Sequence, residues 1–117
     1  MAKFLFILNG PPYGNEHSFN GLRLADSLAR HAGNEVKVFL IGDAAACAKR
    51  GQKVPQGFYN VELMLHPILR HHGAIGVCAS CMDARGMTDL ELAEGCHRSS
   101  MEELTNWTLW SDKVLVF

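Results

Sequence analysis

The sequence predicts a single α/β domain, residues 1–117, in which helices cover both faces of a mostly parallel sheet: a three-layer α/β/α sandwich. Short apolar runs rich in Val, Ile and Phe alternate with segments whose apolar residues recur at helical spacing. The run Lys3–Leu8 is apolar throughout after its lysine, as expected of a strand covered on both faces. The chain has 117 residues, which is enough for one domain and too few for two.

The composition favours a soluble protein with a real core. Hydrophobic residues make up 48% of the chain, and the formal net charge is -1. A net charge this close to zero gives no strong electrostatic attraction to nucleic acid or to an anionic membrane, so neither is an expected partner. No apolar run approaches the ~20 residues needed to cross a bilayer, and Phe4–Leu8 is too short for a signal peptide. We therefore expect a cytoplasmic protein whose four cysteines are free, catalytic or metal-bound rather than disulfide-linked.

The first half of the chain predicts two strands joined by a helix. The strands are Lys3–Leu8 and Val36–Ile41, with a Gly- and Pro-rich loop, Asn9–Gly14, after the first. In the helix, Gly33 has the place of a C-cap glycine. The inward residues of this helix are Leu22, Ala25, Ala29 and Ala32. A short helix, Ala44–Lys49, is expected to follow the second strand with Asp43 as its N-cap.

The second half predicts two more helices and further strands. A helix over Asn60–His72 contains Pro67, so we expect it to be kinked or interrupted. Two overlapping capping boxes, Ser99 with Glu102 and Ser100 with Glu103, predict the start of the last helix. The inward residues of that helix are Met101, Leu104 and either Trp107 or Thr108. The remaining strands are predicted over Ala74–Cys78, Leu90–Ala93 and Val114–Phe117.

Three loops are expected to meet at one edge of the sheet. Ligands of parallel α/β sheets bind beyond the carboxyl ends of the strands. The loops at that edge are Asn9–Asn15, Gly42–Cys47 and Cys78–Gly86. This arrangement places Cys78 at the rim of the sheet.

Cys78 and Cys81 form a Cys-x-x-Cys pair at a strand-to-helix junction, which is the strongest chemical signal in the chain. A helix N-terminus lowers the pKa of a thiol, and Arg85 adds a positive charge nearby. Asp83 is expected to act as a cap or to pair with Arg85. We expect Cys78 to be the nucleophile. Cys81 is expected either to resolve Cys78 to a disulfide or to assist it by hydrogen bonding, and Arg85 to hold the thiolate or the incoming anion. The alternative interpretation is that both cysteines pack as small hydrophobic residues.

A zinc site is the rival chemistry for these thiols. Cys78, Cys81, Cys96 and His97 supply four donors, but only the first two have a spacing typical of zinc ligands. Adjacent residues on a strand point apart, so Cys96 and His97 make a poor second half. No metal is therefore predicted.

The loop Asn9–Gly14 follows the first strand but lacks a nucleotide-binding pattern. Its two prolines remove amide donors that a phosphate would need, so no cofactor is predicted. We expect this loop to form a rigid wall of a ligand pocket. The pocket residues would be Asn9, Gly10, Tyr13 and Cys47. The alternative for Cys47 is a thiol packed within an alanine-rich helix.

Together, several segments in this order resemble the DsrE/DsrF-like family, also called the YchN- or TusD-like group, over nearly the whole chain. The segments are Asn9–Gly14, Gly42–Asp43 with Cys47–Ala48, Gly51–Asn60, Cys78–Gly86 and Ser111–Phe117. The resemblance implies a compact α/β/α fold with a five-stranded parallel sheet. It also implies a homotrimer or homohexamer, or a hetero-assembly of related chains. Trp107 and Trp110, which we expect in the core or at a subunit contact, agree with an oligomer.

The better understood members of this family are cytoplasmic sulfur carriers. In these proteins a loop cysteine accepts sulfur as a persulfide and passes it to a partner, and Cys78 is the position here that matches it. The resemblance thus implies a sulfur carrier or sulfurtransferase with donor and acceptor proteins as partners. It assigns no role to Cys81. The alternative is a non-catalytic oligomeric module of the same fold that binds a small ligand or a protein.

Overall fold

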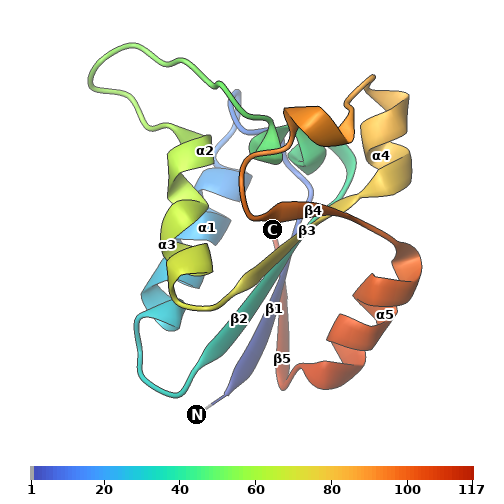
Figure 1. Ribbon diagram of the computed structural model, residues 1–117. Helices are drawn as coiled ribbons and strands as arrows, with labels where there is room; N and C mark the ends of the chain where they lie inside the picture. The colour runs from blue at the N-terminus through green and yellow to red at the C-terminus, as the bar shows by residue number, and fades with distance from the viewer. Residues whose placement is uncertain (1) are drawn as a thin grey trace.

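Five parallel strands form one sheet in the order β4-β3-β2-β1-β5 in the computed structural model, which describes residues 2–117 (Figure 1). The predicted α/β architecture is confirmed. The strands are β1 (Lys3–Leu8), β2 (Glu35–Leu40), β3 (Ala74–Cys78), β4 (Cys96–Ser99) and β5 (Lys113–Val116). The α-helices are α1 (His17–Ala29), α2 (Val61–Met64), α3 (His66–Arg70), α4 (Ala79–Ala84) and α5 (Met101–Trp110), and the 3₁₀ helices are η1 (Gly42–Ala48) and η2 (Asp89–Glu91).

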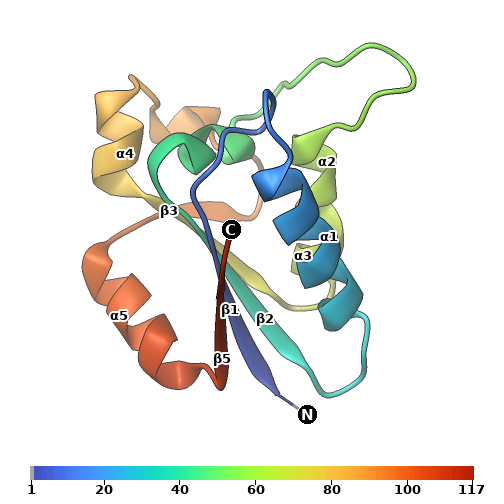
Figure 2. The ribbon, with the colours of Figure 1, turned by 180° about the vertical axis from the view of Figure 1, so that it is seen from behind.

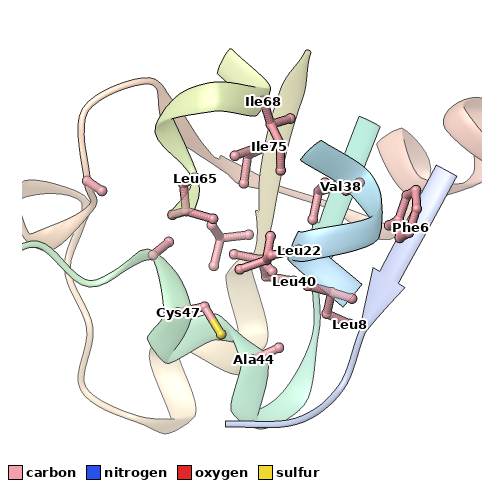
Figure 3. Packing of buried hydrophobic residues seen from close by; sticks show 14 of the residues in the cluster. Phe6, Leu8, Leu22, Val38, Leu40, Ala44, Cys47, Leu65, Ile68 and Ile75 are labelled. Carbon is pink, nitrogen blue, oxygen red and sulfur yellow. The ribbon is translucent and has the colours of Figure 1, made fainter. Parts of the chain in front are cut away.

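The two faces of the sheet are covered unequally. Helices α1, α2 and α3 lie against one face, and α5 lies alone against the other (Figures 1 and 2). Side chains alternate along a strand, so the apolar runs of β1 and β2 supply both faces. On the α1 face, Phe6, Leu8, Val38 and Leu40 join the main core (Figure 3). On the α5 face, Leu5 and Phe39 pack with Leu104 and Trp107 in a smaller cluster.

The first half of the chain follows the prediction with two corrections. Helix α1 ends at Ala29, and Ala32 is exposed beyond it. The Asn34 side chain donates a hydrogen bond to the Leu28 carbonyl (3.1 Å). This contact provides a partner for a carbonyl in the last turn of α1, so Gly33 is not needed as the C-cap. Gly33 does have a left-handed φ of 86°, but in the turn after the helix. Asp43 does not cap η1; its carboxylate lies elsewhere, as described below.

The expected interruption of the Asn60–His72 helix is confirmed. It divides at Leu65 into α2 and α3, because Pro67 has no amide hydrogen to continue the helical ladder. Asn60 caps α2 by accepting a hydrogen bond from the Leu63 amide (3.2 Å). No helix within residues 2–117 is long and apolar enough to span a membrane.

The strand predicted over Leu90–Ala93 is wrong. A capping box between Thr88 and Glu91 closes the 3₁₀ turn η2 there. The edge strand is β4 instead, and its sequence Cys-His-Arg-Ser has no apolar alternation to reveal it. β4 pairs with β3 through backbone hydrogen bonds, and the pattern of side chains along a strand does not predict such pairing.

Helix α5 starts from one capping serine rather than two. Ser100 accepts a hydrogen bond from the Glu103 amide (3.2 Å), whereas the Ser99 hydroxyl donates to the Glu103 carboxylate (2.6 Å). The box between Ser99 and Glu102 is therefore not formed. Leu104 and Trp107 face the sheet as predicted, but Met101 is 64% exposed. The first turn of α5 thus stands beside the end of β4.

Candidate functional site

The three predicted loops do meet at the carboxyl ends of the strands. β3 carries Cys78 to this edge, and α4 begins immediately after it. The amide of Gly42, the first residue of η1, donates a hydrogen bond to the Cys81 sulfur (3.1 Å). The Cys47 thiol in turn points at the Gly10 carbonyl (3.9 Å), which links the loop after β1. The edge is visible at the top of Figure 1, around α4.

Cys78 has the environment of a reactive thiol. It is half-buried and occupies the N-cap position of α4, with its sulfur 3.4 Å from the Ser80 hydroxyl. Partial burial raises its pKa, but hydrogen bonds from the Cys81 thiol, the Ser80 hydroxyl and the backbone amides of both residues outweigh burial and lower the pKa. A thiolate is therefore stabilised at Cys78.

The pKa of the Cys81 thiol is shifted in the opposite direction, upward. Burial and its hydrogen bond to Cys78 raise the pKa of the Cys81 thiol, more than the Gly42 amide and the Arg85 charge lower it. Of the two thiols, Cys78 is therefore the more readily ionised, and the Cys81 thiol can donate a hydrogen bond to the Cys78 sulfur. The two members of the Cys-x-x-Cys pair are chemically unequal.

Arg85 is fixed at the rim by two contacts. Its guanidinium donates to Asp43 (2.7 Å) and to the Cys81 carbonyl (3.1 Å). The expected pairing with Asp83 is wrong, because Asp83 accepts two hydrogen bonds from Arg98 (2.8 Å each). Arg85 thus holds a positive charge close to both thiols, and Asp43 keeps it in place.

Cys47 and the residues proposed for a ligand pocket are engaged within the protein. Cys47 is fully buried among apolar side chains (Figure 3), and burial raises the pKa of its thiol to about 12. The Asn9 side chain donates to the Phe117 carbonyl (3.1 Å), and Gly10 accepts from Ser18 (2.6 Å). The Tyr13 hydroxyl donates a hydrogen bond to the Gln52 side chain (2.5 Å) and accepts one from the Val61 amide (3.0 Å). These contacts tie the loop to the body of the domain.

Cys96 and His97 point to opposite faces of the sheet. Cys96 packs against the main core, and burial raises the pKa of its thiol to about 12. His97 lies on the α5 face, where its Nε2 is hydrogen-bonded to Glu103 and its ring meets Trp107 edge to face. Across residues 2–117, no group of three or more His, Cys, Asp or Glu side chains is arranged to hold a metal ion.

A cavity of about 570 Å³ near Cys78 was not predicted from the sequence. Ala79, the residue after Cys78, forms part of its wall, together with residues of β4 and the start of α5. Ser99 and Glu103 line it. The sequence assigns these two residues only to separate capping boxes, Ser99 with Glu102 and Ser100 with Glu103. Sequence reasoning also missed Asp43 and Gly42 as supports of the thiol pair, since each acts through a contact with a distant segment. It missed Ser80 as well, although this residue lies only two positions after Cys78.

Comparison with known proteins gives a consistent family match. The DsrE/DsrF-like family model matches residues 2–117. The protein YchN of Escherichia coli is 40% identical over the full length of both chains. An uncharacterised protein of Methanopyrus kandleri is 33% identical, over 95% of this chain and 90% of its own length.

Solved structures agree with this match. The crystal structure of the E. coli YchN protein superposes with a TM-score of 0.93 at 39% identity, over 100% of each chain. A protein of unknown function from Methanobacterium thermoautotrophicum superposes with a TM-score of 0.72 over 97% of each chain. At 13% identity, the second structure supports the fold alone.

Substituting Ser80→Ala should make Cys78 less reactive. The substitution removes the hydroxyl that hydrogen-bonds the Cys78 sulfur, so the thiol pKa rises and less thiolate is present at neutral pH. We expect the alkylation rate of Cys78 at neutral pH, followed by peptide mass spectrometry, to fall roughly two- to fivefold. Ser27→Ala, which changes an exposed serine on α1, is the control. Equal rates in wild type and Ser80→Ala would show that the hydroxyl does not support the thiolate.

Proposed function

The chain belongs to the DsrE/DsrF-like family, and on that premise we propose that it is a cytoplasmic sulfur carrier whose Cys78 holds sulfur as a persulfide. The observation that carries the proposal is that the pKa values of the two thiols are shifted in opposite directions. The pKa of Cys78 is lowered and that of Cys81 is raised, so Cys78 is suited to act as a nucleophile and Cys81 as the hydrogen-bond donor beside it.

Loading of Cys78 requires no added oxidant or reductant. The Cys78 thiolate attacks the outer sulfur of a persulfide on a donor protein, forming a new sulfur–sulfur bond. The bond between that sulfur and the donor breaks, and the donor leaves as a thiolate. Release to an acceptor thiolate is the same exchange in the other direction. A thiol of low pKa is also a good leaving group, so the environment of Cys78 favours both steps.

Cys81 and Arg85 support these steps from fixed positions. Cys81 keeps its proton and can hydrogen-bond either the free thiolate or the inner sulfur of the persulfide. Arg85, held by Asp43 at 2.7 Å, places a positive charge where an anionic persulfide arrives. Neither residue has to form a covalent bond to sulfur for the transfer to proceed.

Mass spectrometry after incubation with a persulfide donor tests the carrier function. We expect one added sulfur atom on Cys78 in wild type and none in Cys78→Ser. Cys81→Ala should still accept sulfur, since Cys78 remains, although more slowly because the thiolate loses a hydrogen bond. The control is Cys96→Ser, which removes a buried thiol of high pKa and should load like wild type.

Wild type and Cys78→Ser that load alike would contradict the carrier function. So would a Cys78 thiol that no alkylating reagent reaches in the native protein. Either result would favour a non-catalytic binding module of the same fold.

We also propose that the chain works as a homotrimer or homohexamer. β5 is an edge strand, and its Val114 and Val116 are 42% and 64% exposed. They pair in register with Leu5 and Ile7, on the face that only α5 covers. Leu109 of α5 adds an apolar side chain that is 80% exposed. A second copy of the chain would bury this surface.

Sedimentation at micromolar concentration should therefore give a trimer or a hexamer. Val116→Asp should shift the distribution to smaller species, because it places a charge in the buried contact. Leu90→Asp, which changes an equally exposed leucine on η2, should leave the distribution unchanged. A wild-type protein that sediments only as a monomer would refute the proposed assembly.

A further inference from the structure

The cavity beside Cys78 has the size of a small-molecule site. Its volume of about 570 Å³ falls in the usual range for ligand pockets. Ala79 lines one side, and Ser99, Glu103 and Trp107 line the others. Cys78 packs against the cluster that contains Trp107, so its side chain lies on the same face of the sheet as the cavity. Cys78 itself is not among the lining residues; Ala79, the next residue, makes the contact, so a molecule in the cavity lies one residue away from Cys78.

Strand register places His97 one small molecule away from Cys78. Cys78 is paired with Ser99, and Gly76 with His97, so all four residues face α5. His97 is thus one strand across and two residues back from Cys78, and this diagonal separates their Cα atoms by roughly 8 Å. Two side chains on the same face at this Cα separation are close enough for one small molecule to contact both.

The His97 ring is oriented as a base. Its Nε2 is hydrogen-bonded to Glu103, and Glu103 is itself fixed by the Ser99 hydroxyl (2.6 Å). Within residues 2–117 the other ring nitrogen, Nδ1, makes no hydrogen bond, and 44% of the side chain is exposed. When Nε2–H donates to the carboxylate, Nδ1 carries the lone pair. A carboxylate on one nitrogen stabilises the imidazolium that forms when the other takes a proton.

The neighbouring charged side chains do not prevent Glu103 from pairing with His97. Lys37 is near enough to Glu103 to help keep that carboxylate ionised. Arg98 is bound to Asp83 and Asp89, so it does not compete for Glu103. The carboxylate is therefore left to Ser99 and His97.

We propose that this cavity admits a low-molecular-weight thiol that receives sulfur from Cys78, and that His97 is the base that takes the proton of that thiol. The inference rests on the carrier function proposed above. Glu103 and Ser99 act as positioning residues, since they touch His97 or one another rather than the reacting sulfur.

The transfer balances without any further reactant. His97 Nδ1 takes the proton of the small thiol, and the thiolate attacks the outer sulfur of the Cys78 persulfide. A bond forms between those two sulfur atoms, and the bond from the Cys78 sulfur to the outer sulfur breaks. Cys78 leaves as a thiolate, the product is a small-molecule persulfide, and the imidazolium returns its proton to Cys78 or to solvent.

Two thiols that differ in acidity give the sharpest test. Mercaptoethanol is almost wholly protonated at neutral pH and needs a base, whereas trifluoroethanethiol is substantially ionised already. We expect His97→Asn to slow single-turnover transfer from persulfide-loaded protein to mercaptoethanol by about tenfold or more. Transfer to trifluoroethanethiol should slow less than about twofold, because no proton has to be removed from a thiolate.

Matched variants complete the design. His71→Asn changes an exposed histidine at the end of α3 and should leave both rates unchanged. In His97→Ala, added imidazole should restore part of the transfer to mercaptoethanol, since the cavity has room for it. Equal slowing of both thiols, or no slowing of either, would overturn the role of His97. Saturation by a protein thiol but never by a small thiol would overturn the substrate class.

A second reaction separates this inference from the carrier function. Methyl methanethiosulfonate converts Cys78 to a methyl disulfide, and the same two thiols can attack that bond whether or not the protein ever accepts a persulfide. The same His97-dependent difference between the thiols supports the base even if persulfide loading fails. Its absence in both reactions contradicts the base while leaving the carrier function intact.

Discussion

The hydrogen bond from the Gly42 amide to the Cys81 sulfur is the contact on which the arrangement of the site depends. It joins the start of η1, just after β2, to the first turn of α4, two segments about forty residues apart in sequence (3.1 Å, Gly42 to Cys81). Gly42 has a left-handed φ of 60°, a conformation that favours glycine. With Cys81 fixed in this way, the N-terminus of α4 and Cys78 are fixed as well.

The four cysteines fall into three chemical classes because the fold places them in different surroundings. Cys47 and Cys96 lie on or near the face packed by α1 and α3, where burial holds the pKa of each thiol at about 12. Cys81 is tied to a backbone amide and keeps its proton. Only Cys78 combines partial exposure with several hydrogen-bond donors. Reactivity here follows from position at the strand end, not from the cysteine itself.

The architecture was predictable because apolar periodicity reports burial directly. β1, β2 and β3 are apolar on both faces, and the position of Pro67 predicted the break between α2 and α3. β4 was missed because its four residues carry no such pattern, and it is this strand that brings Ser99 and His97 beside Cys78. The Cys-x-x-Cys spacing revealed the thiols. The supports from Asp43, Gly42 and Glu103 depend on long-range packing, which short-range sequence pattern does not encode.

Titration of thiolate absorbance in the ultraviolet tests the central claim, that Cys78 and Cys81 are chemically unequal. The account predicts that one thiol ionises below the ordinary pKa of cysteine, that Cys78→Ser abolishes this transition, and that Cys81→Ala retains it at a higher pH. The sign follows from the hydrogen bonds, since Cys81 stabilises the Cys78 thiolate and its removal raises the Cys78 pKa. A low transition that survives in Cys78→Ser, or two thiols that both ionise at the ordinary pKa, would contradict the account.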